Sequence, residues 1–232
     1  MKVPISARLL LCASMVPKGA RVADIGTDHG YLGIYLLKNG LAEFVTASDL
    51  RPDPLQNARM HAAQYGTTDR MDFVLSDGLQ GLTPETADTL VMAGMGGDLM
   101  VSILSSCSWV RDARFTLILQ PQSAGNALRA YLAEAGYSIL EEQLTKDGAF
   151  FYTVMKMRFG GHMELTPAQQ YLSPKLLESG SGLLEPYCAR LIRALEVSVE
   201  GLRGAEKQRP ERLSYFEQAL EGLKEMQKTW QV

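Results

Sequence analysis

The stretch that decides the fold is Val22–Leu32, whose sequence is VADIGTDHGYL. A short apolar strand runs into Asp24, two glycines flank Asp28, and an apolar helix follows. Glycines at such a junction allow a tight turn and let backbone N–H groups approach a ligand closely. The stretch therefore predicts a ligand-binding loop at the end of the first strand of an α/β sheet.

Two more apolar strands end in an acid. Asp49 closes the stretch FVTASD, and Asp77 closes FVLSD. Asp49 lies about where a nucleotide-binding crossover places the carboxylate that holds a ribose. Because parallel strands end at one edge of a sheet, three strands that each end in Asp predict a site for a nucleoside-type cofactor. The alternative is that these acids are strand-end turn residues of an inert sheet.

Composition sets the size and class of the protein. The chain has 232 residues, of which 46% are hydrophobic and 21% charged, enough for one α/β domain and a smaller appendage. The three cysteines, Cys12, Cys107 and Cys188, are far apart without CxxC spacing, which favours reduced thiols and predicts no metal site. A net charge of -3 argues weakly against a nucleic-acid partner, although a local basic patch is compatible with it.

Targeting signals are not apparent in the sequence. The N-terminus lacks the apolar segment and cleavage site of a signal peptide, and no apolar run approaches the length of a membrane span. We therefore expect a cytoplasmic protein that does not contact membranes. The sequence makes no prediction about protein partners.

Before Gly160-Gly161, strand and helix patterns alternate, which predicts a parallel sheet covered on both faces. Ser6 is a candidate cap for the first helix, and Lys146-Asp147-Gly148 predicts a hairpin turn. The expected strands are 21–25, 43–49, 72–76, 88–93, 115–119, 138–145 and 150–157, and the expected helices are 6–16, 31–38, 52–65, 98–104 and 125–135.

After Gly161 the strand patterns stop and helical periodicity begins. Apolar residues follow helical spacing at Leu184, Tyr187, Leu191, Leu195 and Leu202, and again at Leu213, Phe216, Leu220, Leu223 and Trp230, with Gln227 in phase. Helix breakers lie between them at 201–210. We predict two antiparallel helices that form a short coiled coil, with two ordinary amphipathic helices packed on the first domain as the alternative. The predicted domains are 1–160 and 161–232.

The glycine loop differs from a dinucleotide-binding loop. A GxGxxG motif is replaced by Asp24-x-Gly26-x-Asp28-x-Gly30, and both acids would repel a pyrophosphate. A cofactor that lacks phosphates and carries positive charge is favoured instead. S-adenosylmethionine fits, because it combines a ribose and an adenine with an ammonium and a sulfonium.

The chain also resembles a known family, the bacterial tRNA methyltransferases that methylate N1 of the adenine at position 22. The motifs that carry the resemblance are Ser6-x-Arg8-Leu9, Ala23–Leu32 with its Asp-His pair, Asp77-Gly78-Leu79, Ala93-Gly94-Met95-Gly96-Gly97 and Leu117-Ile118-Leu119-Gln120-Pro121. Asp49 and Gln122 depart from it, since relatives often carry Glu and Asn there. The resemblance implies a Rossmann-like class I methyltransferase sheet, a helical C-terminal domain, S-adenosylmethionine as donor and tRNA as substrate.

This reaction assigns expected roles to the cofactor residues. Asp24 and Gly26 would hold the methionine end, with Asp24 pairing with the ammonium, and Asp49 would accept hydrogen bonds from the ribose hydroxyls. Asp77 would accept a hydrogen bond from the adenine amino group. The predicted cofactor-binding residues are Asp24, Gly26, Asp49, Asp77, Gly78, Ala93 and Gly94.

Two residues are candidates for catalysis. Adenine N1 has a free lone pair, so the reaction depends mainly on positioning. Asp28 would stabilise the positive charge that develops on the methylated adenine, unless it only forms the turn. His29 would bond the base or a phosphate, or would instead pack as a cap of the following helix.

The remaining candidates concern the RNA. Tyr31 would stack on a base or lie in the core, and exposed backbone after the fourth strand would receive the base, turned out of the RNA stack. Basic residues of segment 203–212 would contact the tRNA backbone, unless they are merely solvated. The predicted substrate-binding residues are Arg8, Tyr31, Met95, Gly96, Gln120, Pro121, Arg203, Lys207 and Arg209.

Other functional classes are compatible with parts of the pattern. A methyltransferase for another RNA position or a small molecule would share every cofactor residue, and in the latter case would turn over without RNA. A nicotinamide oxidoreductase would share the sheet, but the Asp-rich loop disfavours it. A non-catalytic RNA-binding protein would leave the cofactor residues without an explanation.

Overall fold

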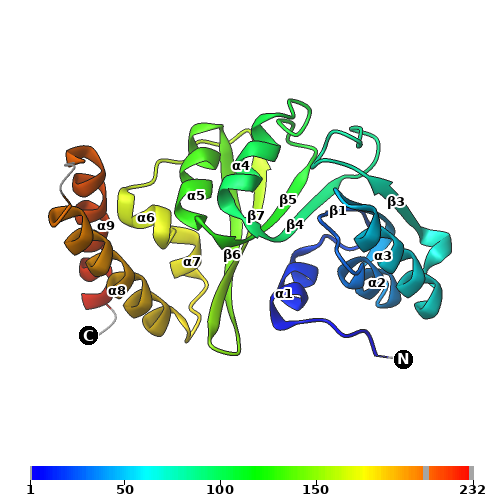
Figure 1. Ribbon diagram of the computed structural model, residues 1–232, viewed down its shortest axis with the longest axis horizontal. Helices are drawn as coiled ribbons and strands as arrows, with labels where there is room; N and C mark the ends of the chain where they lie inside the picture. The colour runs from blue at the N-terminus through cyan, green and yellow to red at the C-terminus, as the bar shows by residue number, and fades with distance from the viewer. Residues whose placement is uncertain (1, 206–208, 230–232) are drawn as a thin grey trace.

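A twisted seven-stranded sheet organises the chain, and a helical region adjoins one end of it (Figure 1). The computed structural model describes residues 2–205 and 209–229. The strands follow the order β3-β2-β1-β4-β5-β7-β6, in which β1 to β5 are parallel and β7 is antiparallel to both β5 and β6. Their bounds are β1 Ala20–Ile25, β2 Ala42–Asp49, β3 Met71–Leu75, β4 Thr89–Gly96, β5 Thr116–Ser123, β6 Tyr137–Asp147 and β7 Phe150–Phe159. This confirms the predicted Rossmann-like α/β class.

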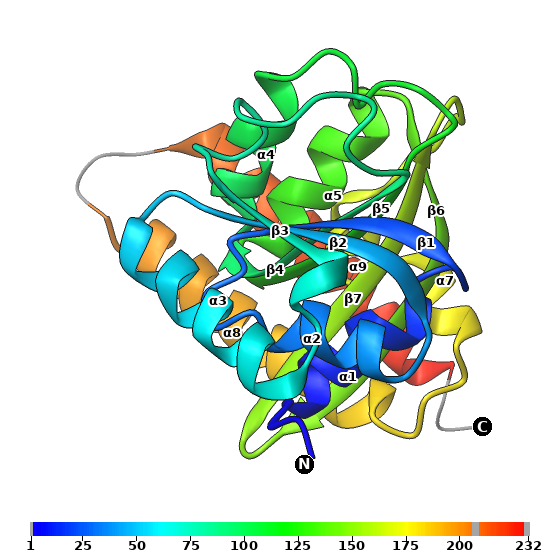
Figure 2. The same cartoon turned by 90° about the vertical axis from the view of Figure 1, so that its right-hand side faces the viewer.

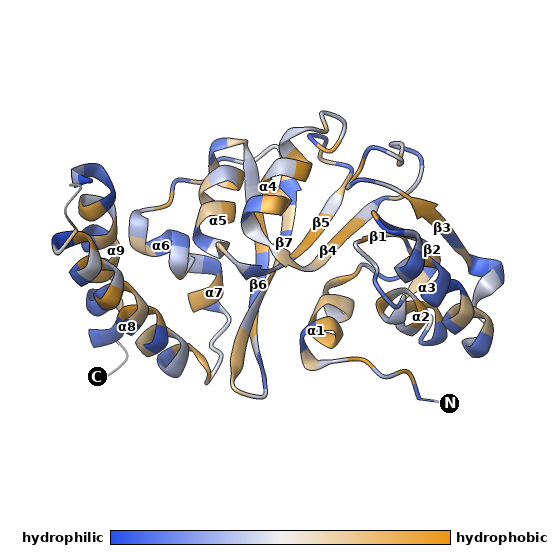
Figure 3. Cartoon of the chain, in the orientation of Figure 1, coloured by the Kyte–Doolittle hydropathy of each residue, from blue (hydrophilic) through white to orange (hydrophobic). Residues whose placement is uncertain are grey.

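Helices cover both faces of the sheet, and each face has its own apolar core (Figure 1). One face carries α1 (Ala7–Met15), α2 (Tyr31–Lys38) and α3 (Pro52–Tyr65), followed by the short 3-10 helix η1 (Thr68–Arg70). The other face carries α4 (Gly97–Ser105) and α5 (Gly125–Glu134). Figure 3 shows the central strands β4 and β5 as strongly apolar, as expected for strands buried on both faces.

Helix α2 and helix α3 have the predicted bounds, and Pro52 occupies the first turn of α3 as expected. Two local predictions need correction. Ser6 does occupy the N-cap position of α1, but its side chain makes no capping hydrogen bond and its Oγ is buried without a partner. The hairpin turn is Gly148-Ala149 rather than 146–148, because β6 continues to Asp147, which pairs with Phe150. Gly148 has a φ of 58°, which suits glycine in a tight turn.

Strand β4 is longer than predicted and runs through the glycine segment to Gly96. This extension matters because it brings the backbone of β4 close to the chain that follows β5. A Cβ atom added at Gly97 would lie 2.4 Å from the carbonyl oxygen of Ala124. Gly97, the first residue of α4, therefore permits an approach to the backbone of Ala124 that no other residue type allows.

In the described part of the C-terminal region there are four helices, of which the sequence predicted the two long ones. Helices α8 (Leu184–Arg203) and α9 (Pro210–Lys228) lie side by side and antiparallel (Figures 1 and 2). The short helices α6 (Pro167–Tyr171) and α7 (Pro174–Glu178) were not predicted. All four share a third apolar core, to which β6 contributes Leu144, so the region packs directly on the hairpin. A coiled coil in the strict sense stays a prediction, because α9 packs against α6 as well as α8.

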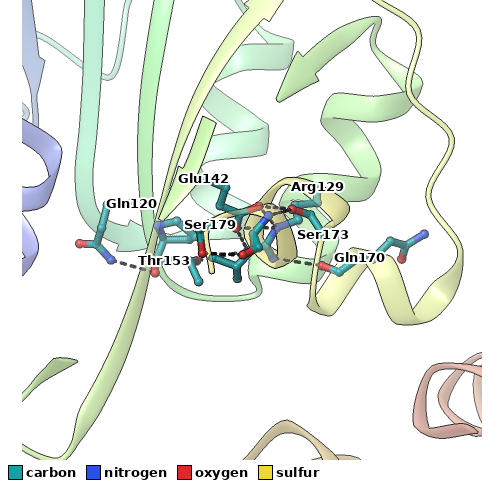
Figure 4. Close-up of polar contacts among 9 residues, drawn as sticks. Gln120, Arg129, Glu142, Thr153, Gln170, Ser173 and Ser179 are labelled. Atoms are coloured by element: carbon teal, nitrogen blue, oxygen red, sulfur yellow. Dashed lines mark hydrogen bonds and ion pairs between the residues drawn. The ribbon is translucent and has the colours of Figure 1, made fainter. Parts of the chain in front are cut away.

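A buried ion pair joins the sheet to the helical region (Figure 4). Arg129 of α5 and Glu142 of β6 are each about 1% exposed and form a charge-assisted pair. The guanidinium also donates to the Thr153 hydroxyl of β7 at 3.2 Å and to the carbonyl of Gln170 in α6 at 3.0 Å. Ser173, the N-cap of α7, donates to Glu142 at 2.5 Å. One polar cluster thus fixes two strands and three helices relative to each other.

None of the helices within 2–205 and 209–229 combines the length and apolar character needed to cross a bilayer.

The ion pair predicts a large effect of a conservative change. Glu142→Gln keeps the shape and the hydrogen-bond acceptor but leaves the Arg129 charge buried without compensation, so it should lower the free energy of unfolding by about 3–5 kcal/mol. Urea unfolding followed by circular dichroism measures this. The matched control is Glu141→Gln on the exposed neighbour in the same strand, which should change stability by less than about 0.5 kcal/mol. Equal stabilities of the two variants would contradict the prediction.

Candidate functional site

A cleft opens at the edge of the sheet where β1 and β4 end. We call it the glycine-loop cleft. It is lined by Arg8, Leu9, Asp24, Gly26, Thr27, Asp28, His29, Tyr31, Leu32 and Ala93. These residues come from α1, from β1 and β4, from the loop between β1 and α2, and from the first turn of α2. Ligands of open α/β sheets bind at this edge, because strand ends and helix N-termini meet there.

The loop after β1 owes its shape to three residues with positive φ. Gly26, Asp28 and Gly30 have φ values of 74°, 53° and 75°. The amides of Gly26 and Thr27 both donate to the carbonyl of Ser48 at 2.9 Å. These two hydrogen bonds attach the loop to the end of β2. A Cβ at Gly30 would lie 2.9 Å from the Cβ of Ala58, so this glycine lets α2 begin close against α3.

Asp28 forms the turn, as one of its two interpretations anticipated. Asp tolerates the left-handed conformation better than most residues, and its amide donates to Asp49 Oδ2 at 3.2 Å. Its side chain remains 66% exposed and lies 3.7 Å from His29 Nε2. A turn role and a role for the free carboxylate are therefore compatible.

Asp24 is a buried carboxyl group at the end of β1. It is 4% exposed, and Thr27 Oγ1 donates to its Oδ2 at 2.7 Å. Burial raises the pKa of Asp24 to about 6, while the Thr27 hydrogen bond opposes this shift, Asp49 adds to it and Arg8 reduces it. Burying an ionised carboxyl group is costly unless a cation compensates it, so Asp24 is prepared for a cationic ligand.

Arg8 brings a positive charge from α1 into the same cleft. Its Nη1 donates to Gln120 Oε1 at 2.9 Å. The amide nitrogen of Gln120, which is labelled in Figure 4, in turn donates to the carbonyl of Pro121 at 2.9 Å. A Cβ at Gly94 would lie 2.9 Å from Arg8 Nη1, so a glycine with φ 87° makes room for the guanidinium. The cleft thus offers one buried acid and one oriented cation to a ligand that carries both charges.

Asp49 and Asp77 extend the site along the edge of the sheet. Asp49 Oδ2 accepts from the Asp28 amide and its Oδ1 accepts from the Arg51 amide at 3.1 Å, which fixes the carboxylate at the end of β2. Asp77 follows β3 and is exposed. A Cβ at Gly78 would lie 2.9 Å from the side chain of Ile103, so the chain turns close against α4. The strand order β3-β2-β1-β4 places the predicted cofactor residues along one edge.

An aromatic cluster beside the loop includes His61, a residue that the sequence analysis missed. The rings of Tyr31 and His61 stack with centroids 4.7 Å apart, and the Tyr31 hydroxyl lies 3.3 Å from His61 Nε2. His61 Nδ1 lies 2.9 Å from the carbonyl of His29, which can only accept, so Nδ1 carries the proton. Nothing in the sequence indicated this contact, because His61 lies in the middle of α3.

The predicted substrate residues fall into two groups. Met95 packs near Gly26, where an added Cβ would lie 3.0 Å from its Cε, and Gly96 pairs with Ser123 across β4 and β5. Arg8 and Tyr31 line the glycine-loop cleft itself, and Gln120 reaches it through its hydrogen bond with Arg8. Pro121 lines a separate hollow beyond the cleft.

Arg203 and Arg209 belong to the helical region and are not among the residues that line the cleft. In Figure 1, α8 and α9 lie at the opposite end of the molecule from α2 and α3. Arg203 forms an ion pair with Glu217, with 2.5 Å between Nη2 and Oε1, so its charge is compensated. Arg209 is exposed at the start of α9, and Lys207 lies outside the described residues. Figure 2 shows that α8 ends on the side where β2 ends and α3 begins.

Within the described part of the chain, no group of His, Cys, Asp and Glu side chains is arranged to hold a metal ion.

Comparison with known proteins gives concordant matches. The family described as "Methyltransferase domain" matches residues 5–155. The tRNA (adenine(22)-N(1))-methyltransferase of Bacillus subtilis strain 168 is 30% identical over 159 residues, which cover 68% of this chain and 67% of that protein. The crystal structure of the B. subtilis m1A22 tRNA methyltransferase has a TM-score of 0.86 at 25% identity, covering 97% of this chain and 100% of that one. A Streptococcus pneumoniae protein solved in complex with S-adenosyl-L-methionine has a TM-score of 0.82 at 26% identity, covering 96% and 99%.

The raised pKa of Asp24 predicts a pH-dependent effect on stability. Because its pKa in the folded chain exceeds the ordinary value of 3.8, the folded chain binds this proton more tightly than the unfolded chain. The penalty for the buried charge is therefore full above about pH 6 and fades toward pH 4. Asp24→Asn should raise the free energy of unfolding by about 1–3 kcal/mol at pH 8 and far less at pH 4.

Urea unfolding of parent and variant at both pH values measures the difference. Asp98→Asn, on an exposed acid, is the matched control and should show no such pH dependence. An Asp24→Asn variant that is less stable than the parent at pH 8 would contradict the assignment.

Proposed function

The chain belongs to the family of the tRNA (adenine-22 N1) methyltransferases, and we propose that it transfers the methyl group of S-adenosylmethionine to N1 of adenine 22 in tRNA. The observation that carries this proposal is the line of acids and glycines along the edge of the sheet, with Arg8 facing Asp24. A tRNA substrate also favours a cytoplasmic location.

The residues of the glycine-loop cleft fit the methionine end of the cofactor. That end is a zwitterion, and the cleft presents Asp24 for the ammonium and Arg8 for the carboxylate. Arg8 is predicted from the sequence to contact the RNA, whereas its hydrogen bond with Gln120 and its position beside Gly94 favour a role in holding the cofactor. Gly26 and Ala93 contribute backbone to the same cleft.

The remaining cofactor groups match the neighbouring strand ends. Asp49 is held by two backbone amides, and each of its oxygens retains a lone pair for a ribose hydroxyl. Asp77 and the backbone of Gly78 lie one strand further along, where the adenine would bind. S-adenosylmethionine supplies an electrophilic methyl group and gives up its sulfonium charge in the transfer.

Asp28 is the residue proposed for the chemical step. N1 of adenine needs no base to become a nucleophile, so the protein contributes chiefly by orientation. Methylation leaves a positive charge on the adenine, and an exposed carboxylate at the mouth of the cleft would stabilise that developing charge. The Tyr31–His61 stack and His29 border the same mouth and offer aromatic faces to a base that is turned out of the RNA.

Residues 161–232 are proposed to help hold the tRNA, as a helical domain beside the catalytic domain 1–160. The proposal is supported by the direction of α8. In Figure 2, α8 ends on the same side of the molecule as β2, whose last residue is Asp49. The ion pair between Arg203 and Glu217 weakens the case for Arg203 as a phosphate contact. Exposed Arg209, and Lys207 by its sequence position, remain the candidates at this end of the arm.

The function predicts selective modification of a single nucleotide. An unmodified tRNA transcript with A22 should gain one methyl group, and nucleoside analysis should identify 1-methyladenosine. The matched transcript with G22 should gain none, because N1 of guanine carries a proton and has no free lone pair. Methylation of both transcripts, or of small molecules without RNA, would contradict the proposal.

Two aspartate variants separate cofactor holding from chemistry. Asp49→Ala should weaken S-adenosylmethionine about 10- to 100-fold, since a charge-assisted hydrogen bond contributes about 1.5–3 kcal/mol. Asp28→Asn keeps the turn but removes the charge, so single-turnover methylation should slow while affinity changes little.

Calorimetry and rapid-quench kinetics measure the two effects. Asp69→Asn, on an exposed acid in η1, is the control and should alter neither quantity. Equal affinity in Asp49→Ala, or a parental rate in Asp28→Asn, would refute the corresponding assignment.

A further inference from the structure

A second cavity, of about 220 Å³, lies beyond the end of β5. We call it the β5 cavity. Its floor is Pro121–Asn126, which comprises the end of β5 and the first residues of α5. Its walls come from the start of β7 and from helices α6 and α8, with Phe151, Tyr171 and Tyr187 as aromatic members. The catalytic sheet and the helical region therefore build this cavity together.

The β5 cavity adjoins the place where the target base is proposed to bind. Gly96 pairs with Ser123 in the sheet, and the backbone of Gly97 approaches the carbonyl of Ala124 closely. Gln120 faces Arg8 in the glycine-loop cleft, whereas the next residue, Pro121, lines the β5 cavity. The two hollows are thus separated by the strand ends of β4 and β5, which lie about 4.8 Å apart as neighbouring strands.

The lining of the β5 cavity differs chemically from that of the glycine-loop cleft. The cleft contains Asp24 and Asp28, but no carboxylate is among the described residues that line the β5 cavity. Aromatic rings and amides take their place. A nucleobase suits such a lining, because it stacks on aromatic side chains and forms hydrogen bonds with amides along its edge.

The polar groups of the β5 cavity are held in place from outside. Asn126 donates to the Tyr215 hydroxyl of α9 at 3.2 Å, and that hydroxyl donates to Gln170 of α6 at 2.8 Å. Arg129 also lines the cavity, and its guanidinium already donates hydrogen bonds to Glu142, Gln170 and Thr153. These contacts orient Asn126 and Arg129 before a ligand arrives, which lowers the entropic cost of binding.

We propose that the β5 cavity binds a nucleotide of the tRNA that is adjacent to adenine 22, with its base stacked on Tyr171. The inference rests on the proposed function, since the target adenine itself must reach the glycine-loop cleft. A nucleotide next to it along the RNA strand would then reach the hollow on the other side of the β4 and β5 ends. The absence of acids from the described lining suits the phosphates that flank this nucleotide.

The test compares stacking variants of the intact protein. Tyr171→Leu should weaken tRNA binding about 5- to 100-fold, the range for loss of one stacked base, whereas Tyr171→Phe keeps the ring and should bind within twofold of the parent. Both variants should bind S-adenosylmethionine like the parent. Gln122→Trp, at an exposed residue near the end of β5, should fill the cavity without disturbing the core and weaken tRNA binding similarly.

A fluorescent base gives a readout that does not depend on activity. With 2-aminopurine placed at position 21 or 23 of the tRNA, the parent should quench the fluorescence of one of these probes on binding, and Tyr171→Leu should abolish the quenching. Parental tRNA affinity in both Tyr171→Leu and Gln122→Trp, or quenching that survives in both, overturns the inference. If these outcomes contradict the inference while the parent protein methylates A22 normally, only the assignment of the β5 cavity is wrong. If the parent protein does not methylate A22, the proposed function itself is wrong.

Discussion

The buried pair between Arg129 and Glu142 is the interaction on which the relative placement of the two halves of the molecule depends. Each ion would be expensive to bury alone, and together they are tolerated only because hydroxyl and carbonyl groups satisfy their remaining hydrogen bonds. Those partners come from β7, α6 and the start of α7. Apolar packing is non-directional and would allow the helical region to shift along the sheet, whereas the hydrogen bonds of this ion pair require one relative position of the two parts. The helical region is therefore set at a defined position beside the carboxyl edge of the sheet.

At that edge, ligand binding and stability oppose each other. Asp24 has a raised pKa because it is buried, so the chain without a cationic ligand bears an electrostatic cost above about pH 6. Thr27 and Arg8 only partly offset this cost. A ligand with an ammonium group would complete the compensation, so relief of this electrostatic cost would contribute to the free energy of ligand binding. Gly26 and Gly94 keep this site open to its neighbours. A Cβ atom at Gly26 would displace the side chain of Met95, and a Cβ atom at Gly94 would displace the guanidinium of Arg8.

The sequence predicted the sheet, its helices and the edge where the acids meet because these features depend on local patterns. Alternating apolar segments, the proline at the start of α3 and the glycines of the loop each have a direct structural consequence. It missed α6 and α7, since helices of five residues have no period to detect, although Thr166-Pro167 and Ser173-Pro174 are recognisable starts. The stacking of His61 on Tyr31, the pairing of Arg203 with Glu217 and the buried ion pair join residues distant in sequence, so only the fold reveals them.

The distribution of charge explains how a chain of net charge -3 can be suited to a polyanionic substrate. The acids of the site are concentrated on β1, β2 and β3, on the side proposed for a cationic cofactor, while the β5 cavity has aromatic and amide groups in its described lining. In the proposed reaction, positive charge leaves the sulfonium and appears on the adenine. Asp28, whose exposed carboxylate lines the same cleft as Asp24, is the residue proposed to stabilise that charge. The end of β4 lies between the two hollows: Gly94 makes room for Arg8 in the glycine-loop cleft, and Gly96 pairs with Ser123, which lines the β5 cavity. The proposed methyl transfer therefore takes place within the cleft, beside the acids, while the β5 cavity holds only the neighbouring nucleotide.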